Sequence, residues 1–525
     1  MAYAQQRDRS VMLPLIAAAC ILYAFVCIPA FAETGNADPV SGVQPVTIKI
    51  AGDTDRRDLQ IRTADASTAT TNAAPDLLWK FAVFWDYQFY GKTAIPAVDG
   101  GYLIAGESRM NGTEESAQGA AIVLEEPSNG TTTWKWAWLY GTTGTYDSFS
   151  DAAADGTSGY VFAGGSKVFN PPGTDGWLLH TDADGYGDSG AYWQRTWPGA
   201  DSRYADQFNA VVRTTDGGFA ASGITGSYHP DTTSSDAWLI RTDSTGTTTG
   251  SGAYDGTVPK SAESIRQTSD GGFILAGSET PAGSSGTKLL LIRLNADNSV
   301  RWQKEFGNNP GNGAYDVRET SDGGFIAAGY TTDSSGHRSI YLVRTDGNGN
   351  ALWEAMPASG RTTAEGHGVV ETSDGGFLVA GSSGGALVVK VDSTGATEWE
   401  NVYLTQYPES TVASLEKTDD GGFLISGTRI QSDEENPGFQ IIKLGPEKTV
   451  QQPVALPGMT NLPTDPDGDG LYEDLNGNGR ADFSDIVLFF SQIEWIAENE
   501  PVPLFDFNGN GRIDFNDIVT QFEEL

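Results

Sequence analysis

Short apolar runs alternate with polar turns along residues 77–445, and one phrase recurs within them. The runs are four to eight residues long and rich in β-branched and aromatic side chains, which is typical of strands. The phrase is an Asp-Gly-Gly turn followed by an apolar strand. It reads DGGYLIAG at 99–106, DGGFAASG at 216–223, DGGFILAG at 270–277, DGGFIAAG at 322–329, DGGFLVAG at 374–381 and DGGFLISG at 420–427, with the variant GYVFAGG at 159–165 after Asp155. A spacing near fifty residues indicates a repeat architecture.

Each unit predicts four strands. An apolar segment ends in Thr just before the turn, and Asp-Gly then makes a tight hairpin because both residues tolerate positive φ. The second strand is apolar at nearly every position, as expected for a strand buried on both faces. The third ends in a charged residue and a turn, as in IYLVRTD at 340–346. The fourth often carries Trp, at Trp136, Trp193, Trp302, Trp353 and Trp399. Seven such units predict an all-β fold, a seven-bladed β-propeller over residues 77–445.

The ends of the repeat predict how the ring closes. The seventh unit stops after its third strand, Phe439 to Leu444, and the segment Leu77 to Phe81 precedes the first unit. Pairing this segment with the last unit would supply the missing fourth strand and remove two exposed sheet edges.

The connections predict which face of the propeller binds. The first-to-second and third-to-fourth turns are short, whereas the others are long and differ in every unit, as at 107–119, 224–236 and 428–438. Strand alternation puts the long loops on one face, and such loops commonly carry binding groups. Aromatic residues in them could contact sugars or peptides, or could only pack against the blades. They are Tyr146, Tyr204, Tyr228, Tyr254, Tyr315 and Tyr407.

A cation recurs at one aligned position of the third strand. A ring of positive charge for an anionic ligand is one interpretation. The simpler one is that each cation pairs with a turn Asp or a carboxylate of a neighbouring unit. The residues are His180, Arg241, Arg293, Arg344, Lys390 and Lys443.

Catalytic signatures are missing from the sequence. The four histidines, His180, His229, His337 and His367, lack metal-ligand spacing. No acid–base pair can be selected from the 69 acidic residues. The pattern favours a binding or structural protein and leaves open a carbohydrate-active enzyme, a glycoside hydrolase or lyase.

A twelve-residue loop is written twice near the C-terminus, DLNGNGRADFSD at 474–485 and DFNGNGRIDFND at 506–517. Side-chain oxygens at loop positions 1, 3, 5, 9 and 12, with Gly at position 6, are typical of Ca²⁺ loops, and position 7 adds a backbone carbonyl. The predicted ligands are Asp474, Asn476, Asn478, Arg480, Asp482 and Asp485, then Asp506, Asn508, Asn510, Arg512, Asp514 and Asp517. The alternative is a pair of Asx-rich turns without metal.

A third loop overlaps the first. Asp465, Asp467, Asp469 and Glu473 fit positions 1, 3, 5 and 9, whereas position 12 would be Asn476, which the next loop uses. This segment binds a third ion or is simply an acidic turn. Residues 465–525 carry fifteen Asp or Glu against Arg480 and Arg512. We therefore expect folding of this part to be linked to calcium.

Residues 465–525 resemble a dockerin module. The resemblance rests on the doubled loop, on Asp at position 12 and on an apolar helix after each loop. It implies a small α-helical calcium-binding domain whose helices dock onto a cohesin-like or envelope partner. Loop positions 10 and 11, which set partner choice in many dockerins, are Phe483-Ser484 and Phe515-Asn516 in place of small polar residues. The repeat resembles extracellular Asp-Gly-Gly-Phe proteins of archaea and bacteria.

The N-terminus predicts secretion. Arg7 and Arg9 precede an apolar stretch at 11–31 that ends in Ala-Phe-Ala, which indicates a signal peptide at 1–32, with an uncleaved anchor as the alternative. We expect no membrane span after cleavage, a flexible segment at 33–76 and a linker at 446–464. A net charge of −37 argues against nucleic acid as a partner. The expected protein is extracellular, with a propeller that binds polysaccharide, glycoprotein or another surface protein.

Overall fold

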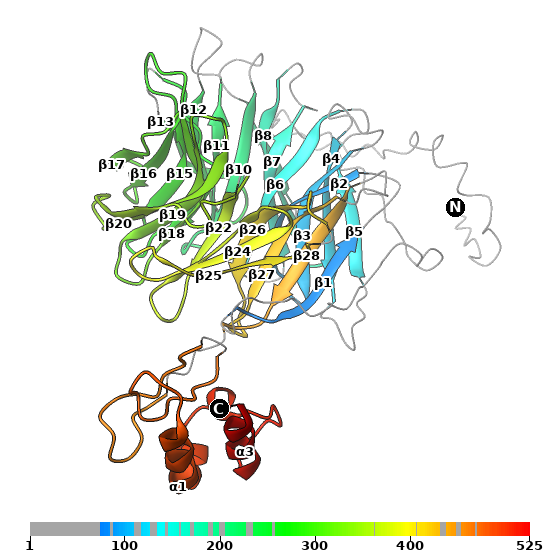
Figure 1. The fold of residues 1–525 in the computed structure, drawn as a ribbon. Helices are drawn as coiled ribbons and strands as arrows, with labels where there is room; N and C mark the ends of the chain where they lie inside the picture. Colours follow the sequence, from blue (N-terminus) through cyan, green and yellow to red (C-terminus); the bar gives the residue numbers. More distant parts are fainter. Residues whose placement is uncertain are drawn as a thin grey trace, which may run out of the picture. The chain divides into compact units, whose positions relative to one another are not determined.

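The computed structural model contains seven four-stranded antiparallel sheets, which confirms the predicted seven-bladed propeller (Figure 1). The structure describes residues 74–524, apart from 84–87, 110–116, 126–133, 142–144, 157–158, 168–172, 187–192, 199–204, 227–234, 255–257, 362, 406, 431–436, 448–452 and 468–469. The predicted signal peptide and nearly all of the segment 33–76 therefore lie outside the described residues.

Six blades each use four strands that are consecutive in the chain. The first three blades contain β2 (Gln88–Pro96), β3 (Tyr102–Arg109), β4 (Ala117–Leu124) and β5 (Trp134–Tyr140); β6 (Asp147–Ala154), β7 (Gly159–Ser166), β8 (Asp175–Asp182) and β9 (Trp193–Trp197); and β10 (Asp206–Arg213), β11 (Phe219–Thr225), β12 (Asp236–Thr242) and β13 (Thr248–Tyr254). The next three contain β14 (Ser264–Gln267), β15 (Phe273–Glu279), β16 (Lys288–Leu294) and β17 (Val300–Phe306); β18 (Gly311–Glu319), β19 (Phe325–Thr332), β20 (Arg338–Thr345) and β21 (Ala351–Ala355); and β22 (Glu365–Glu371), β23 (Phe377–Ser382), β24 (Ala386–Val391) and β25 (Thr397–Tyr403).

The seventh blade joins the two ends of the repeat, as predicted. It contains β26 (Thr411–Lys417), β27 (Phe423–Arg429) and β28 (Gly438–Leu444), and its outer strand is β1 (Leu77–Val83). The two strands pair antiparallel, with Phe81 opposite Ile441. Phe81 is buried in a core that also holds Phe89 of the first blade and Phe439 of the seventh. Closure therefore rests on apolar burial as well as on backbone pairing.

The repeated turn is built from the Asp side chain and one glycine. In the fifth blade, Gly323 has φ +78° and donates its N–H to the Thr320 carbonyl at 2.8 Å. The Asp322 carboxylate accepts from the Thr320 hydroxyl at 2.7 Å and from the Gly324 N–H at 3.1 Å. Among the described turns the left-handed residue is glycine and not Asp. The expectation that Asp contributes through positive φ is therefore wrong, since Asp acts as a side-chain acceptor.

The aligned cations hold these turns. Each lies within salt-bridge distance of the turn Asp of its own blade: His180 with Asp155 at 3.1 Å, Arg241 with Asp216 at 3.4 Å, Arg293 with Asp270 at 2.5 Å, Arg344 with Asp322 at 2.6 Å, Lys390 with Asp374 at 2.6 Å and Lys443 with Asp420 at 2.8 Å. The pairing interpretation is confirmed, and these residues form no ligand-binding ring.

The recurring tryptophans connect neighbouring blades. Four of the five donate the indole N–H to a backbone carbonyl in the outer turn of the next blade: Trp136 to Ala183 at 2.7 Å, Trp193 to Ser244 at 3.0 Å, Trp302 to Gly347 at 3.2 Å and Trp353 to Ser393 at 2.9 Å. In three of these turns the glycine lies against the same ring, and a Cβ added at Gly395 would sit 2.9 Å from Trp353.

The C-terminal part is helical, as expected. It contains α1 (Phe483–Asn499), α2 (Val502–Phe505) and α3 (Phe515–Glu524). Asp482 caps α1 in a reciprocal capping box with Asp485. Part of the predicted linker packs here, because Leu456 is buried in the same core as Phe489 and Phe505. Among the described residues, no helix is long and apolar enough to cross a membrane.

Candidate functional site

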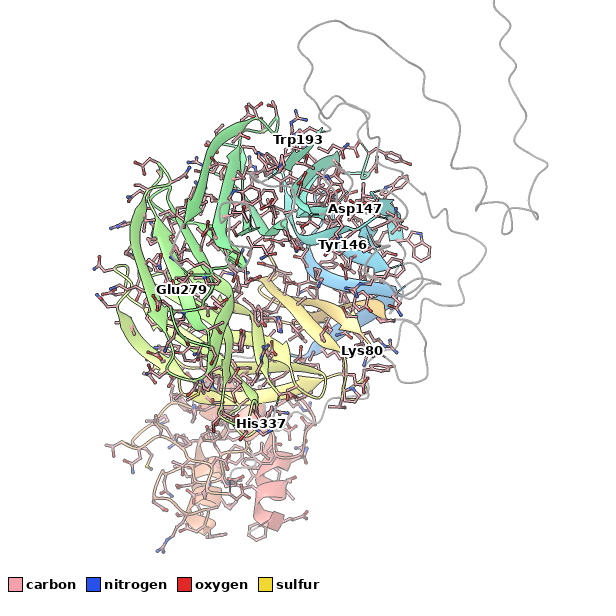
Figure 2. The ribbon with its side chains drawn as sticks, turned by 90° about the horizontal axis from the view of Figure 1, so that it is seen from above. Lys80, Tyr146, Asp147, Trp193, Glu279 and His337 are labelled. Atoms are coloured by element: carbon pink, nitrogen blue, oxygen red, sulfur yellow. The ribbon has the colours of Figure 1, made fainter. Side chains whose placement is uncertain are left out.

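A funnel opens around the propeller axis. Figure 2 shows the blades arranged about a common axis. The cavity has a volume of about 710 Å³ and is lined by the beginnings of the innermost strands and the ends of the second strands. Both positions belong to the long-loop face, so the structure places the cavity on the face that the loop lengths indicate.

One residue from every blade forms a ring at the throat of this funnel. In six innermost strands the pairing with the second strand slips by one residue, a β-bulge, and in the fourth blade the equivalent residue directly precedes β14. We call these residues the bulge ring; they are Lys92, Ser150, Asn209, Glu263, Tyr315, His367 and Ala413. All seven line both the funnel and a narrower chamber of about 80 Å³.

Tyr315 and His367 form a rigid flat wall of the ring. Their rings stack with centroids 4.5 Å apart and planes inclined by 13°. The Tyr315 hydroxyl donates to Glu365 at 2.9 Å, and Arg338 pairs with the same carboxylate at 2.9 Å. Burial lowers the pKa of His367 to about 4, so the imidazole is neutral at physiological pH.

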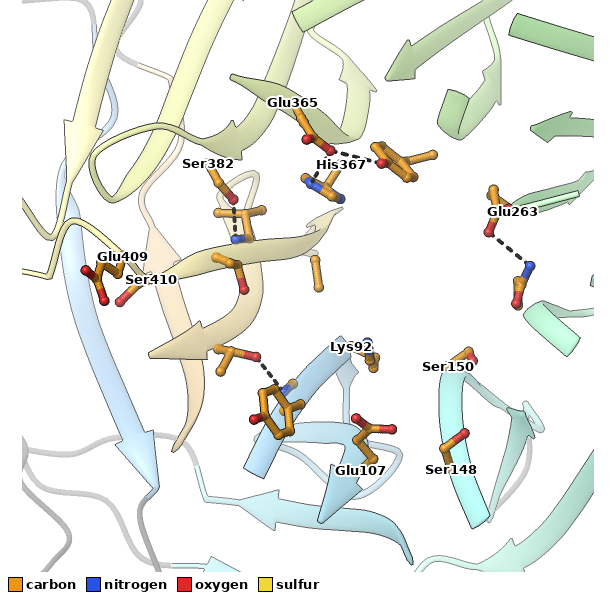
Figure 3. Close-up of a pocket in the computed structure, with 18 of the residues that line it drawn as sticks. Lys92, Glu107, Ser148, Ser150, Glu263, Glu365, His367, Ser382, Glu409 and Ser410 are labelled. Carbon is orange, nitrogen blue, oxygen red and sulfur yellow. Dashed lines mark hydrogen bonds and ion pairs between the residues drawn. The ribbon is translucent and has the colours of Figure 1, made fainter. Parts of the chain in front are cut away.

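Other blades contribute polar and charged side chains to the ring. The Asn209 amide donates to Glu263 at 2.9 Å, and burial raises the pKa of Glu263. Within the part of the chain that the structure describes, neither Glu263 nor Lys92 has an ion-pair partner. Figure 3 shows Lys92, Glu263 and His367 around the same open space.

The chamber beneath the ring is crossed by ion pairs. Arg318 contacts Glu416 at 2.6 Å and Asp316 at 3.1 Å, and Arg266 contacts Asp316 at 3.1 Å. These residues join the fourth and fifth blades to the seventh. Asp151 also lines the chamber, and burial raises the pKa of its carboxyl to about 6 although the Val211 N–H binds it.

The predicted loop aromatics have different positions. Tyr146 and Tyr315 line the funnel, whereas Tyr254 and Tyr407 are buried and pack within the blades. Tyr204 and Tyr228 lie outside the described residues.

The histidines share no site in the described structure. His367 is in the funnel, His180 pairs with its turn Asp, and His337 lies at an exposed turn 3.4 Å from Asp333. His229 lies outside the described residues.

Sequence reasoning missed the bulge ring, although the repeat contains a signal for it. In six units the ring residue stands seven positions before the turn Asp, as Asn209 stands before Asp216 and Tyr315 before Asp322. The residue at this position differs in every unit. Only the variant second unit breaks the spacing, at Ser150.

The two predicted calcium loops adopt the same geometry. In the first, the Asp474 carboxylate accepts the N–H of Asn478 at 3.0 Å and of Gly479 at 2.6 Å. Asp485 accepts the N–H of Asn476 at 3.1 Å and of Asp482 at 3.0 Å. Gly479 has φ +85°.

The second loop repeats these bonds 32 residues later. Asp506 accepts from Asn510 at 3.0 Å and from Gly511 at 2.7 Å, and Asp517 accepts from Asn508 at 3.1 Å. Asp474, Asp485 and Asp517 are fully buried. Burial raises the pKa of Asp485, and the neighbouring Asp474 adds to this effect. Converging buried carboxylates with other oxygen donors fit the ligand shell of Ca²⁺, which would compensate their charge.

The predicted third loop also brings its carboxylates together. Oxygens of Asp465, Asp467 and Glu473 lie within 4.8 Å of one another. Gly470 donates its N–H to Asp465 at 2.9 Å, as Gly479 does to Asp474 in the first loop. Asp469 lies outside the described residues.

An exposed apolar face covers the two helices that follow the loops. Its six side chains are between 41 % and 64 % exposed, and they are Phe483, Val487 and Phe490 of α1 with Phe515, Val519 and Phe522 of α3. We call this set the helix face. Its two halves contact each other. The ring centroids of Phe483 and Phe522 lie 6.3 Å apart, and those of Phe490 and Phe515 lie 6.1 Å apart. The predicted partner-binding aromatics thus lie in one pseudo-symmetric patch. The predicted polar neighbours, Ser484 and Asn516, donate their N–H groups to Asp482 and Asp514.

Comparison with known proteins yields only distant likenesses. No protein-family model matches the chain, and no curated protein is similar to it. The WD40 domain of Pan2 from Neurospora crassa is 11% identical, with a TM-score of 0.43, and the match covers 68% of this chain and 90% of that one. A protein of unknown function from Dyadobacter fermentans is 11% identical, with a TM-score of 0.42 and coverages of 71% and 99%. A gluconolactonase from Xanthomonas campestris is 13% identical, with a TM-score of 0.36 and coverages of 76% and 100%. Likenesses this weak assign no function to the chain.

Proposed function

We propose that this chain is an extracellular attachment protein. Its propeller recognises a carbohydrate or a surface protein through the long-loop face, and its C-terminal part is a dockerin-like module that docks onto a cohesin-like or envelope partner. Ca²⁺ bound by the two twelve-residue loops, and by the Asp465 loop as a third site, folds that module. No step of this function requires the metal to do chemistry.

The helix face is the observation that carries the proposal. Monomeric proteins rarely expose a contiguous apolar patch, and such patches commonly mark interaction sites. This one lies on the helices that the calcium loops begin, and its two halves are related by the same 32-residue repeat as the loops, as with Phe483 and Phe515. A partner that recognises one half could therefore recognise the other.

Retention on isolated envelopes of the producing cells tests the docking. We expect the full chain to be retained in calcium and released by EGTA, and a chain ending at residue 447 to be lost under both conditions. Phe483→Asp with Phe515→Asp should reduce retention at least tenfold. Leu352→Asp, at an equally exposed apolar residue of the propeller, is the matched control. Equal retention of all four proteins would contradict docking.

A carbohydrate-active enzyme is the second candidate. The funnel that contains Glu107, Glu263 and Glu365 and the raised pKa of Asp151 favour it, because glycosidases use one carboxyl that stays protonated and one that does not. The test is the release of new reducing ends from a polysaccharide. If the chain releases them and if Asp151→Asn and Glu263→Gln each abolish the release, the propeller is an enzyme and the binding proposal is wrong.

A further inference from the structure

The bulge ring brings one side chain from each of the seven blades to one cavity. The turn Asp, its glycines and its cation recur because each blade has the same packing need. A β-bulge holds the ring position in six blades, and in the fourth the equivalent residue directly precedes β14, yet the position carries Lys, Ser, Asn, Glu, Tyr, His and Ala. A packing role would repeat one residue type. Seven different side chains directed at one cavity indicate selection for a single asymmetric ligand.

We propose that the bulge ring binds the terminal unit of an uncharged carbohydrate chain, a claim that rests on the carbohydrate branch of the proposed function. Glu263 and Asn209 offer a carboxylate and an amide side by side, which suits adjacent hydroxyl groups. Lys92 adds an exposed donor from the first blade. The stacked rings of Tyr315 and His367 offer an apolar surface to the face of a sugar ring.

The wall of the site is fixed before the ligand arrives. The Tyr315 hydroxyl is held by Glu365, which Arg338 holds in turn at 2.9 Å. Arg338 itself lies over the ring of Tyr330 at 4.1 Å from its centroid. Because these side chains are already ordered, binding loses little side-chain entropy.

The charge of the funnel disfavours acidic sugars. Glu107 and Glu365 are paired with Arg109 and Arg338, but Glu263 has no cationic partner among the described residues. Asp151 lies directly beneath. Among the described residues that line the funnel, Lys92 is the one Lys or Arg that could compensate the charge of a uronate or sulfate, whereas hydroxyl groups donate to carboxylates without such a cost.

The narrow floor of the funnel favours binding of the end of a carbohydrate chain over binding of an internal segment. Beyond the ring the cavity narrows to about 80 Å³, and ion pairs of Arg318 with Glu416 cross it. The funnel above has the size of sites that hold small organic ligands. A polymer can thus enter with its terminus and continue outward past the long loops.

Calorimetric titration of the full chain in calcium tests this inference. The probes are neutral oligosaccharides of glucose, xylose, mannose, galactose and N-acetylglucosamine, and oligogalacturonates of the same length. We expect at least one neutral series to bind and the oligogalacturonates to bind at least tenfold more weakly. Tyr315→Ala and Glu263→Gln should each weaken binding at least tenfold at unchanged melting temperature. Tyr186→Ala and Glu305→Gln, at exposed positions away from the funnel, are the matched controls.

Three results would overturn the inference. They are preference for the acidic series, binding that survives both funnel substitutions, and failure of every oligosaccharide to bind. Each leaves the docking half of the proposed function intact, because envelope retention depends on the helix-face variants. A surface protein that binds through the funnel would overturn the inference while supporting the other branch of the proposed function.

Discussion

The turn aspartates are the single residues that most clearly connect stability to pH. The hydrogen bond from Thr320 is the largest influence on the Asp322 carboxyl, and with the Gly324 N–H and Arg344 it lowers the pKa to about 2. Burial raises the pKa of Asp374 and Asp420, but hydrogen bonds from the paired lysine, the turn Thr and a glycine N–H together outweigh it and bring the pKa of each carboxyl to about 2. A lowered carboxyl pKa stabilises the fold above the unfolded-state pKa near 4.

We therefore expect the propeller to lose stability as pH falls from about 4 to about 2. Asp322→Asn should lower the free energy of unfolding at pH 7 by about 1–2 kcal/mol, because it leaves the buried Arg344 without its counter-charge. The difference from the parent should shrink at pH 2. Denaturant unfolding at several pH values measures this, with Asp419→Asn beside an equivalent turn as control. A loss that is independent of pH would contradict the role of the ion pair.

Asp151 changes the stability of the fold with pH in the opposite direction. Burial raises its pKa to about 6, so the folded chain holds this proton more tightly than the unfolded chain and stability falls as pH rises from about 4 through 6. Asp151→Asn should remove that dependence and increase stability at pH 7 by about 1–3 kcal/mol. The measurement is thermal unfolding at pH 4 and pH 7. If the variant is less stable than the parent at pH 7, the ionised carboxylate has a stabilising partner and this account of Asp151 is wrong.

The outer turns and the tryptophans act at the scale of elements. Gly395 ends the outer Asp-x-x-Gly turn between β24 and β25, and Gly336 ends a turn of the same pattern between β19 and β20, with φ of +87° and +85°. A Cβ at Gly395 meets the Trp353 ring, whereas one at Gly336 meets nothing within 4 Å. The pair separates backbone strain from blade-to-blade contact.

Gly336→Ala should cost about 1 kcal/mol through the left-handed backbone alone. Gly395→Ala should cost at least about 1 kcal/mol more, because the methyl group displaces Trp353 from the turn that accepts its N–H. Chemical denaturation of both variants gives the comparison. Equal costs would show that the Trp contact contributes nothing to the junction between blades.

The elements also show which features of the fold can be predicted from the sequence. The strands, the turn phrase and the outer strand at Leu77 follow from local patterns, because hydrophobic period and turn chemistry act within a few residues. The bulge ring is harder to predict, because a bulge is a register slip between two strands and the sequence marks the ring residue only by its spacing from the turn Asp. Leu456 falls within the predicted linker for a similar reason. Its burial depends on helices that follow later in the chain.

At the scale of the whole molecule, the first strand closes the ring. Phe81→Ala should lower the free energy of unfolding by about 3–4 kcal/mol, since it empties the core between the first and seventh blades. Leu78→Ala on the same strand should change it by less than about 0.5 kcal/mol, because Leu78 is exposed. Equal losses of unfolding free energy for the two variants would mean that β1 does not close the ring of blades.

The molecule thus combines two kinds of repeat. Seven blades present different ring residues to one cavity, whereas the doubled loops present equal halves of one helix face, as with Val487 and Val519. We infer that the first is suited to one asymmetric ligand and the second to a partner that binds in either orientation. The second inference depends on calcium folding the C-terminal part.

Calorimetric titration of the calcium-free full chain with Ca²⁺ tests that claim most directly. We predict at least two bound ions and a gain in helical signal on binding. Calcium at about one hundred times its dissociation constant should add about 2.7 kcal/mol per site to the stability of the C-terminal part. Asp485→Ala with Asp517→Ala should abolish the two sites. Absence of calcium binding by the parent chain, or unchanged binding by the double variant, would contradict the account.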